Sequence, residues 1–291
     1  MRVAVLGPGA VGGALAVQLS RAGFPVVAVA RPETAATIRR DGLTLELCGS
    51  ELQGKVQATE RLEEDVDVLL VTVKAPALWS ALDLVAQSHK VATVVPLLNG
   101  IEHLETLRAR FGPRVVAGSM GRFEAYRTSP TRVVQTTPSP VVSLGADGDA
   151  ADILREAGIA VHVDDERRLL WDKVARLAPL AAATAITQRT LGELREDPDW
   201  RATLEAAVAE ACAAGAADGV SLNPDAQWEI LDTMPASVTT SAARDVAAGR
   251  PTELDAIVGG VVRAAERLGV QTPTLERLLD EAEERCRARS R

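Results

Sequence analysis

Short apolar runs alternate with segments of helical periodicity along the first half of the chain. A short apolar run between polar turns is typical of a buried parallel strand, whereas apolar residues that repeat every three or four positions indicate a helix. The predicted strands cover residues 2–6, 26–30, 66–73, 93–96 and 115–119, and the predicted helices cover 10–22, a segment ending near 40, 77–87 and 103–111. Strands that alternate with helices in this way predict a parallel sheet with helices on both faces.

Two pairs of short segments interrupt this alternation. Residues 43–47 and 52–56 flank Cys-Gly-Ser-Glu and predict a hairpin. Residues 131–136 and 141–144 alternate apolar and polar side chains around Thr-Pro-Ser-Pro, which predicts antiparallel edge strands. These segments are expected at the margin of the parallel sheet.

Strand patterns end near residue 164, and long alanine- and leucine-rich helices follow. They are predicted at about 165–187, 199–218, 224–233, 252–268 and 274–288. Asn223 followed by Pro224 is a typical helix start, because Asn caps free N–H groups and Pro fits the first turn. We therefore predict an α/β domain over residues 1–164 and an all-helical domain over residues 165–291.

Composition narrows the class of function. The net charge is -8, there are eight aromatic residues, and no run of Lys or Arg occurs, so a nucleic-acid groove with stacking platforms is not expected. No segment approaches the roughly 20 apolar residues of a membrane span. Three scattered cysteines and a short apolar start predict reduced thiols in a cytoplasmic protein, and no His or Cys spacing indicates a metal site.

A glycine motif lies between the first predicted strand and the first predicted helix. Gly7-Pro8-Gly9-Ala10-Val11-Gly12 matches G-x-G-x-x-G in this position. Gly7 permits the tight turn, Gly9 lets a pyrophosphate approach the backbone, and Gly12 lets the helix pack closely on the strand. Within a strand–loop–helix–strand unit the motif predicts a Rossmann-like, doubly wound sheet that binds a dinucleotide. The alternative is a glycine-rich turn without a ligand.

The end of the second predicted strand indicates which dinucleotide binds. Arg31 follows this strand, at the position where NAD-binding proteins carry an acid for the ribose 2′-hydroxyl. An arginine would instead pair with a 2′-phosphate, which favours NADP(H). The alternative is that Glu33 binds a ribose hydroxyl while Arg31 is solvated.

Lys173 is unusual in this chain. Only four of the 32 basic residues are lysines, and Lys173 lies among leucines on a predicted helix. Burial lowers the pKa of a lysine toward neutrality, which cannot happen to an arginine. A lysine tuned in this way can protonate the alkoxide that forms when hydride adds to a ketone. The alternative is a lysine whose ammonium extends along the helix to water.

Several motifs together resemble the ketopantoate reductase (2-dehydropantoate 2-reductase) family along nearly the whole chain. They are Val73-Lys74-Ala75, Leu97-Leu98-Asn99-Gly100-Ile101-Glu102, Trp171-Asp172-Lys173, Thr240-Ser241-Ala242-Ala243-Arg244-Asp245 and Gly249-Arg250-Pro251-Thr252-Glu253-Leu254-Asp255. The resemblance implies a Rossmann domain, a helical domain and an active site in the cleft between them. It also implies NADPH-dependent reduction of a 2-oxo acid to a 2-hydroxy acid, with 2-dehydropantoate as the leading substrate.

The resemblance also implies roles for individual residues. Lys173 is expected to donate the proton, and Glu253 to bind a substrate hydroxyl, set the lysine and lie beside the cofactor. Asn99 and Lys74 are expected to contact cofactor or substrate, and Ser241 to receive the substrate carboxylate. The alternatives are an Asn-Gly turn at Asn99, a helix cap at Ser241 and ordinary N-terminal helix charge at Glu253.

Two departures from the family pattern keep other functions open. Family members often carry Asn four and eight residues after the lysine, whereas this chain has Leu177 and Ala181. A reductase of a bulkier or more apolar 2-oxo acid is therefore one alternative. A related dehydrogenase working in the oxidative direction and a non-catalytic NADP(H)-sensing protein are two others. Alanine-rich helices often pack across subunits, which leaves a homodimer open as an assembly.

Overall fold

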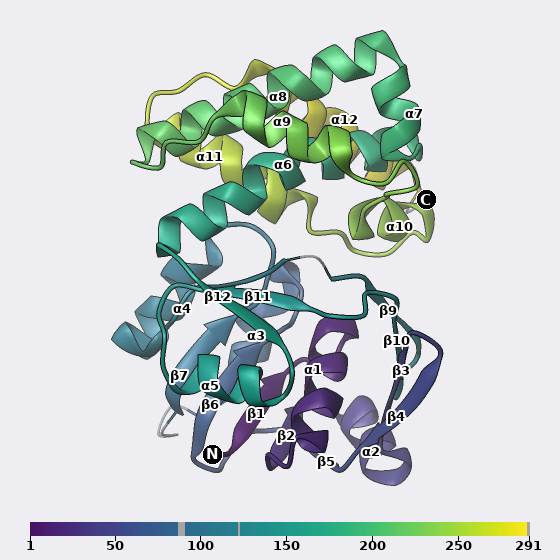
Figure 1. The fold of residues 1–291 in the computed structure, drawn as a ribbon, viewed down its shortest axis with the longest axis vertical. Helices are drawn as coiled ribbons and strands as arrows, with labels where there is room; N and C mark the ends of the chain where they lie inside the picture. The colour runs from purple at the N-terminus through teal and green to yellow at the C-terminus, as the bar shows by residue number, and fades with distance from the viewer. Residues whose placement is uncertain (87–90, 122, 290–291) are drawn as a thin grey trace. The chain divides into compact units, whose positions relative to one another are not determined.

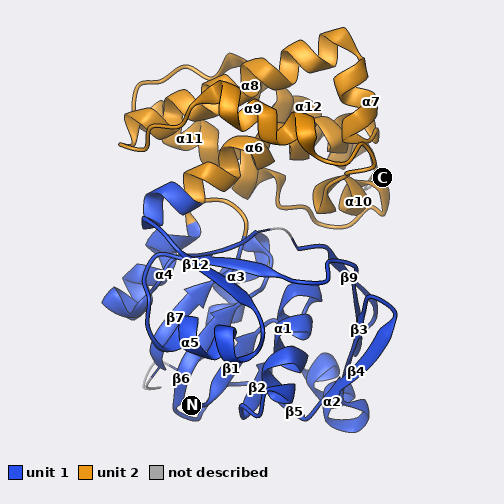
Figure 2. Cartoon of the chain, viewed as in Figure 1, with its two compact units in different colours: residues 1–98, 103–169 blue, residues 99–102, 170–291 orange. Residues whose placement is uncertain are grey.

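The computed structural model describes residues 1–86, 91–121 and 123–289. They form two compact units, which Figure 2 colours separately. Unit 1 comprises Met1–Leu98 and His103–Leu169, and unit 2 comprises Asn99–Glu102 and Leu170–Arg291. The chain therefore passes between the units after residues 98, 102 and 169, whereas the sequence pattern indicates one boundary near residue 164.

Unit 1 is built around a five-stranded parallel sheet (Figure 1), which confirms the predicted fold class. In spatial order its strands are β5 (Val56–Thr59), β2 (Val26–Val29), β1 (Val3–Leu6), β6 (Val66–Val71) and β7 (Val91–Pro96). The helices of this part are α1 (Ala10–Arg21), α2 (Pro32–Asp41), α3 (Leu78–Leu82) and α4 (His103–Phe111), with 3-10 turns η1 (Ala75–Ala77) and η2 (Gly112–Arg114). Every residue of the central strand β1 is buried.

The helix predicted over residues 77–87 is shorter than expected. It ends at Leu82, because Val85 forms a parallel bridge with Leu62 instead of continuing the helix. Gln87 lies outside the described residues.

Two smaller sheets complete unit 1. The first has the order β4 (Ser50–Gly54), β3 (Leu43–Leu47), β10 (Arg132–Gln135) and β9 (Ala125–Ser129). The second has the order β12 (Ala160–Val163), β11 (Val141–Leu144) and β8 (Gly118–Met120). Helix α5 (Asp149–Glu156) lies between β11 and β12 in the chain. The predicted hairpin is confirmed as β3 and β4, but its second strand is Ser50–Gly54 instead of 52–56, because Val56 begins β5 of the parallel sheet.

The predicted strands 131–136 and 141–144 both exist, but they do not pair with each other. β10 pairs with β3 and β9, whereas β11 pairs with β12 and β8. Pro138 and Pro140 lie between them. Proline has no N–H group to donate across a hairpin, so the intervening segment leads the chain into a different sheet.

Unit 2 is helical (Figure 1). Its helices are α6 (Glu166–Thr187, which begins in unit 1), α7 (Leu191–Glu196), α8 (Pro198–Ala217), α9 (Pro224–Thr233), α10 (Ser241–Ala247), α11 (Gly260–Arg267) and α12 (Pro273–Arg289). Many small side chains, among them Ala175, Ala181 and Ala211, are fully buried in its core, so the helices can approach one another closely. The Asn223 side chain accepts a hydrogen bond from the N–H of Asp225 (2.9 Å), which confirms the predicted cap.

The helix predicted over residues 252–268 is not uniform. A π-helical turn, η3 (Asp255–Gly259), precedes α11, and Glu253 lies just before this turn. Such wide turns are rare and are found frequently at functional sites.

Three further observations concern chemistry predicted from composition. Among the described residues, no helix is both long and apolar enough to cross a membrane. Within the same residues, no group of three or more His, Cys, Asp or Glu side chains is arranged to hold a metal ion. Cys48, Cys212 and Cys286 are free thiols.

Candidate active site

The glycine loop links the end of β1 to the start of α1. The N–H of Gly7 donates to the carbonyl oxygen of Val29 (3.0 Å), and the Thr72 hydroxyl donates to the carbonyl oxygen of Gly7 (2.8 Å). Both bonds tie the loop to the ends of neighbouring strands. No side chain caps the start of α1 at Gly9. The first N–H groups of this helix therefore have no capping side chain, and such a helix start suits an anion such as the pyrophosphate of a dinucleotide.

Gly12 has the close packing that the sequence motif predicts. A Cβ atom at this position would lie 2.5 Å from the carbonyl oxygen of Gly7 and 2.9 Å from Cγ1 of Val5, and it would collide with the Thr72 hydroxyl. Only glycine lets α1 start so close to the strands, so this expectation is confirmed. At Gly9, by contrast, a Cβ atom would meet only the carbonyl oxygen of Gly7, at 3.9 Å.

Arg31 and Lys74 follow the two strands that flank β1. Arg31 is exposed and precedes α2, and Lys74 is exposed and precedes η1. Because β2, β1 and β6 are parallel neighbours, the segments after them emerge at the same edge of the sheet. Among the described residues, no side chain accepts a hydrogen bond from the Arg31 guanidinium. Glu33 is also exposed. A solvent-accessible side chain is therefore present both for binding a 2′-phosphate, at Arg31, and for binding a ribose hydroxyl, at Glu33.

Lys173 lies on α6 in unit 2. Leu169 and Leu170, one helical turn before it, are buried, and so is Leu180, two turns after it, whereas Leu177, one turn after it, is partly buried. Burial lowers the pKa of Lys173 from 10.5 to about 8, while the negative charge of Glu253 acts in the opposite direction. The predicted lowering is confirmed. At neutral pH the amine is still mostly protonated, yet it can release its proton far more readily than a solvated lysine.

Glu253 and Asn99 meet although they are 154 residues apart in the chain. The amide nitrogen Nδ2 of Asn99 donates to Oε2 of Glu253 at 3.2 Å. Glu253 is 7% exposed, and its charge acts on Lys173. The structure therefore brings together Lys173, Glu253 and Asn99 within unit 2.

Ser241 does not cap its helix. The cap of α10 is Thr240, whose hydroxyl accepts from the N–H of Ala243 (3.2 Å), so the cap reading of Ser241 is wrong. Ser241 is exposed at the first position of α10. A buried hydrogen bond of 2.8 Å between the hydroxyls of Thr184 and Thr240 ties this start to α6, the helix that carries Lys173.

A polar network that the sequence pattern does not predict lies beside Lys173. Asp172 accepts from Arg176 (2.8 Å) and from the side-chain amide of Gln227 (2.9 Å), and Arg176 also donates to Gln227. These bonds join α6 to α9 next to the lysine. The spacing of Asp172 and Arg176, four residues apart, indicates an ion pair on a helix. Nothing in the sequence around Gln227 indicates that it joins this pair.

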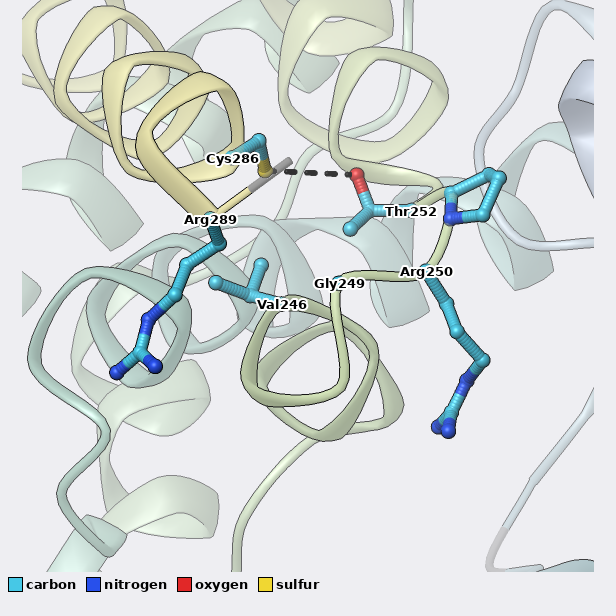
Figure 3. A pocket seen from close by; sticks show the side chains of 7 residues that line it. Val246, Gly249, Arg250, Thr252, Cys286 and Arg289 are labelled. Carbon is cyan, nitrogen blue, oxygen red and sulfur yellow. Dashed lines mark hydrogen bonds between the residues drawn. The ribbon is translucent and has the colours of Figure 1, made fainter. Parts of the chain in front are cut away.

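A separate pocket in unit 2 does not coincide with these residues. It has a volume of about 180 Å³ and is lined by residues of the 246–252 segment and by Cys286 and Arg289. Figure 3 shows Thr252 and Cys286 facing each other across it, with their side-chain oxygen and sulfur 4.0 Å apart. None of the sequence-predicted site residues lines this pocket.

The arrangement supports two chemical tasks. Unit 1 offers an open helix start and two exposed cations to a dinucleotide, and unit 2 offers a desolvated amine on which the charge of a carboxylate acts. A tuned amine of this kind suits proton transfer to or from an oxygen.

Relatives with known names carry the same architecture. The family described as "Ketopantoate reductase PanE/ApbA" matches residues 3–148, and "Ketopantoate reductase PanE/ApbA C terminal" matches residues 165–285. The 2-dehydropantoate 2-reductase of Caulobacter vibrioides is 31% identical, over 93% of this chain and 94% of its own. These matches extend over both the α/β and the helical part.

Solved structures agree. The PanE/ApbA family ketopantoate reductase of Ralstonia eutropha JMP134 is 30% identical, with a TM-score of 0.87 over 100% of both chains. D-mandelate dehydrogenase, solved with NADH and anilino(oxo)acetate, has a TM-score of 0.90 over 100% of both chains but is only 23% identical, so it shows a shared fold alone. On the family matches and the two relatives of about 30% identity, this oxidoreductase belongs to the ketopantoate reductase family.

Proposed function

We propose that this protein reduces a 2-oxo acid to the 2-hydroxy acid, with NADPH as hydride donor and 2-dehydropantoate as substrate. The observation that carries the proposal is the partly buried Lys173, whose desolvated amine has a pKa of about 8 that suits a proton donor, together with the buried Glu253 whose charge acts on it. The family supports the reaction class, and the relative from Caulobacter vibrioides is named for the 2-dehydropantoate reaction.

The reaction needs one hydride and one proton. A nicotinamide dinucleotide, whose pyrophosphate the loop of Gly7, Gly9 and Gly12 would hold, would supply the hydride. The Lys173 ammonium gives its proton to the carbonyl oxygen as negative charge develops there, and the neutral amine later regains a proton from water. The carboxylate of Glu253 keeps the amine protonated near neutral pH, because it opposes the desolvation that lowers the pKa.

The direction of the pH dependence follows from this assignment. If protonated Lys173 is the donor, kcat/KM for reduction falls as pH rises through about 8, and the oxidation rate rises over the same interval. Paired profiles of kcat/KM against pH in both directions check this. A reduction rate that stays flat between pH 7 and pH 9, about one unit on each side of that pKa, would contradict the role of Lys173.

Arg31 is proposed to select the 2′-phosphate of NADPH. An exposed guanidinium after β2 provides a bidentate partner for a phosphate. We expect Arg31→Ala to raise KM for NADPH roughly 10-fold or more, as loss of a charge-assisted contact implies, and to leave KM for NADH nearly unchanged. Glu33→Gln is the matched variant: if Glu33 binds the ribose instead, it will weaken NADH binding and Arg31→Ala will have no effect.

A panel of 2-oxo acids tests the function itself. The loss of NADPH absorbance is followed with 2-dehydropantoate and with branched and aromatic 2-oxo acids. Turnover of 2-dehydropantoate with the highest kcat/KM supports the proposal. If none of the acids is turned over while NADPH still binds, the protein is a nicotinamide-binding protein without this activity.

Leu177 favours a second candidate substrate class. It lies one helical turn after Lys173, is partly buried, and packs against the apolar core of unit 2. Ala181, one turn further, is fully buried. A site whose neighbouring side chains are apolar favours a bulkier, more apolar 2-oxo acid over one that needs polar contacts. A kcat/KM ratio that favours the branched or aromatic acids would support this candidate.

A further inference from the structure

We propose that Glu102 and Arg263 form an ion pair that positions Asn99 against Glu253 for proton transfer. This inference rests on the proposed function of Lys173 and Glu253. It assigns Glu102 and Arg263 as positioning residues, because neither belongs to the Lys173–Glu253–Asn99 group and both act on that group through the chain segment that they hold.

The segment Asn99–Glu102 belongs to unit 2 although both of its flanking segments belong to unit 1. Gly100 adopts a φ of +90° and lies against the backbone of η3. A Cβ atom there would collide with the carbonyl oxygen of Ala256 and lie 3.0 Å from its carbonyl carbon. Ile101 packs against the apolar core of unit 2. The segment is thus seated directly on the π-helical turn that follows Glu253.

Glu102 anchors the end of this segment. Its carboxylate accepts two hydrogen bonds from the Arg263 guanidinium, from Nε at 3.1 Å and from Nη2 at 2.7 Å. Such a bidentate pair fixes orientation as well as distance. Arg267 lies 3.6 Å from the same carboxylate.

Arg263 also reaches back to the π-helical turn. Its Nη1 donates to Oδ1 of Asp255 at 2.7 Å, and its Nη2 donates to the Asp255 carbonyl oxygen at 3.2 Å. One guanidinium therefore joins the Asn99–Glu102 segment to the first residue of η3. Asn99 lies three residues before Glu102, and Glu253 lies two residues before Asp255. The Asn99–Glu253 hydrogen bond and the Glu102–Arg263 ion pair thus connect the two ends of the Asn99–Glu102 segment to the chain before and after η3.

The charges of this cluster stay fixed where Lys173 titrates. Hydrogen bonding from Arg263 holds the pKa of Glu102 below its usual range, and the same bonds raise the pKa of Arg263. Neither group changes its charge near pH 8. Removal of Glu102 takes away a negative charge and removal of Arg263 a positive one, so a fall in the pKa of Lys173 in both variants would report a movement of Glu253, whose charge raises the pKa of the lysine.

The Glu102–Arg263 ion pair is expected to orient the segment that it holds and to contribute little to the stability of the fold. The side chains of Arg263 and Glu102 are 40% and 34% exposed, and ion pairs this accessible add little to the free energy of folding. The matched control is Glu205, which pairs with Arg201 in the same unit at a similar exposure, 46% and 40%. Loss of either carboxylate should leave the melting temperature nearly unchanged.

The experiment compares Glu102→Ala, Arg263→Ala, the double variant and the control Glu205→Ala. Misplacement by about 1 Å can cost 10²-fold, so we expect kcat/KM to fall roughly 10- to 100-fold in the first three and to remain unchanged in the control. The double variant should be no worse than either single one, because the two residues act as a unit. Additive losses, or wild-type activity in Glu102→Ala, would overturn the inference.

A second readout does not depend on turnover. The chain has only four lysines, so NMR of lysine side chains gives few signals, and Lys173→Met identifies that of Lys173. In both Glu102→Ala and Arg263→Ala the pKa of Lys173 should fall below its value of about 8, because Glu253 is no longer held in place; loss of the Arg263 charge alone would raise it. Partial unfolding would change signal intensity and not this midpoint. An unchanged midpoint contradicts the inference, whereas absent turnover in the wild type contradicts only the proposed function.

Discussion

Replacing Lys173 with methionine is expected to lower kcat for 2-oxo-acid reduction by roughly 10²- to 10⁴-fold, the usual contribution of a positioned proton donor. Methionine has a similar length but no proton to give. Without the ammonium, the alkoxide has to be protonated by water or stabilised by weaker dipoles. KM should change much less than kcat, because the lost interaction develops mainly in the transition state.

The fold should tolerate this change well. Burial disfavours the charged form of Lys173, and its helical neighbours Leu169 and Leu170 are buried, so a methionine is compatible with the site. We therefore expect an unchanged or slightly higher melting temperature and intact NADPH binding. Lys55→Met, at an exposed lysine between β4 and β5, is the matched control and should retain full activity. Wild-type kcat in Lys173→Met would exclude this lysine as the donor.

Gly12→Ala is expected to abolish measurable cofactor binding and to destabilise the protein by roughly 1–3 kcal/mol, the range found for overpacked sites. The added methyl group would meet the carbonyl oxygen of Gly7 at 2.5 Å and the side chains of Val5 and Thr72. Backbone atoms cannot rotate away, so α1 has to move off the strands. The loop that presents N–H groups to the pyrophosphate would move with it. Thermal unfolding and titration with NADPH measure both effects.

Gly9→Ala separates binding from folding at the same loop. Its added methyl group would touch only the carbonyl oxygen of Gly7, at 3.9 Å, so stability should be unchanged. The methyl group would nevertheless occupy the space through which a pyrophosphate approaches the backbone, and NADPH affinity should fall. If Gly12→Ala melts like the wild type and binds NADPH normally, the loop is not the dinucleotide site.

Features determined by local sequence were predictable. The close packing at Gly12, the buried strand before the glycine loop and the Asn223 cap depend on residues close to one another in the chain, and all three are confirmed. The lowered pKa of Lys173 could also be predicted, because helical spacing alone places leucines around the lysine.

Features determined by distant pairing were not predictable from one sequence. The partners of β10 and β11 lie in different sheets, and their alternating patterns are equally compatible with a hairpin between them. Glu102 and Arg263 are 161 residues apart and carry no local signal of their pairing. The choice of Thr240 over Ser241 as the cap of α10 depends on backbone geometry that two adjacent hydroxyl residues do not distinguish.

The course of the chain through Asn99–Glu102 limits how relatives can be recombined. A hybrid made by joining the first half of one relative to the second half of another near residue 165 would take this segment from one parent and η3 from the other. Gly100 and Glu102 would then come from one parent, while their contact partners Ala256 and Arg263 would come from the other. We therefore expect hybrids to be active when the Asn99–Glu102 segment is taken from the same parent as the C-terminal half.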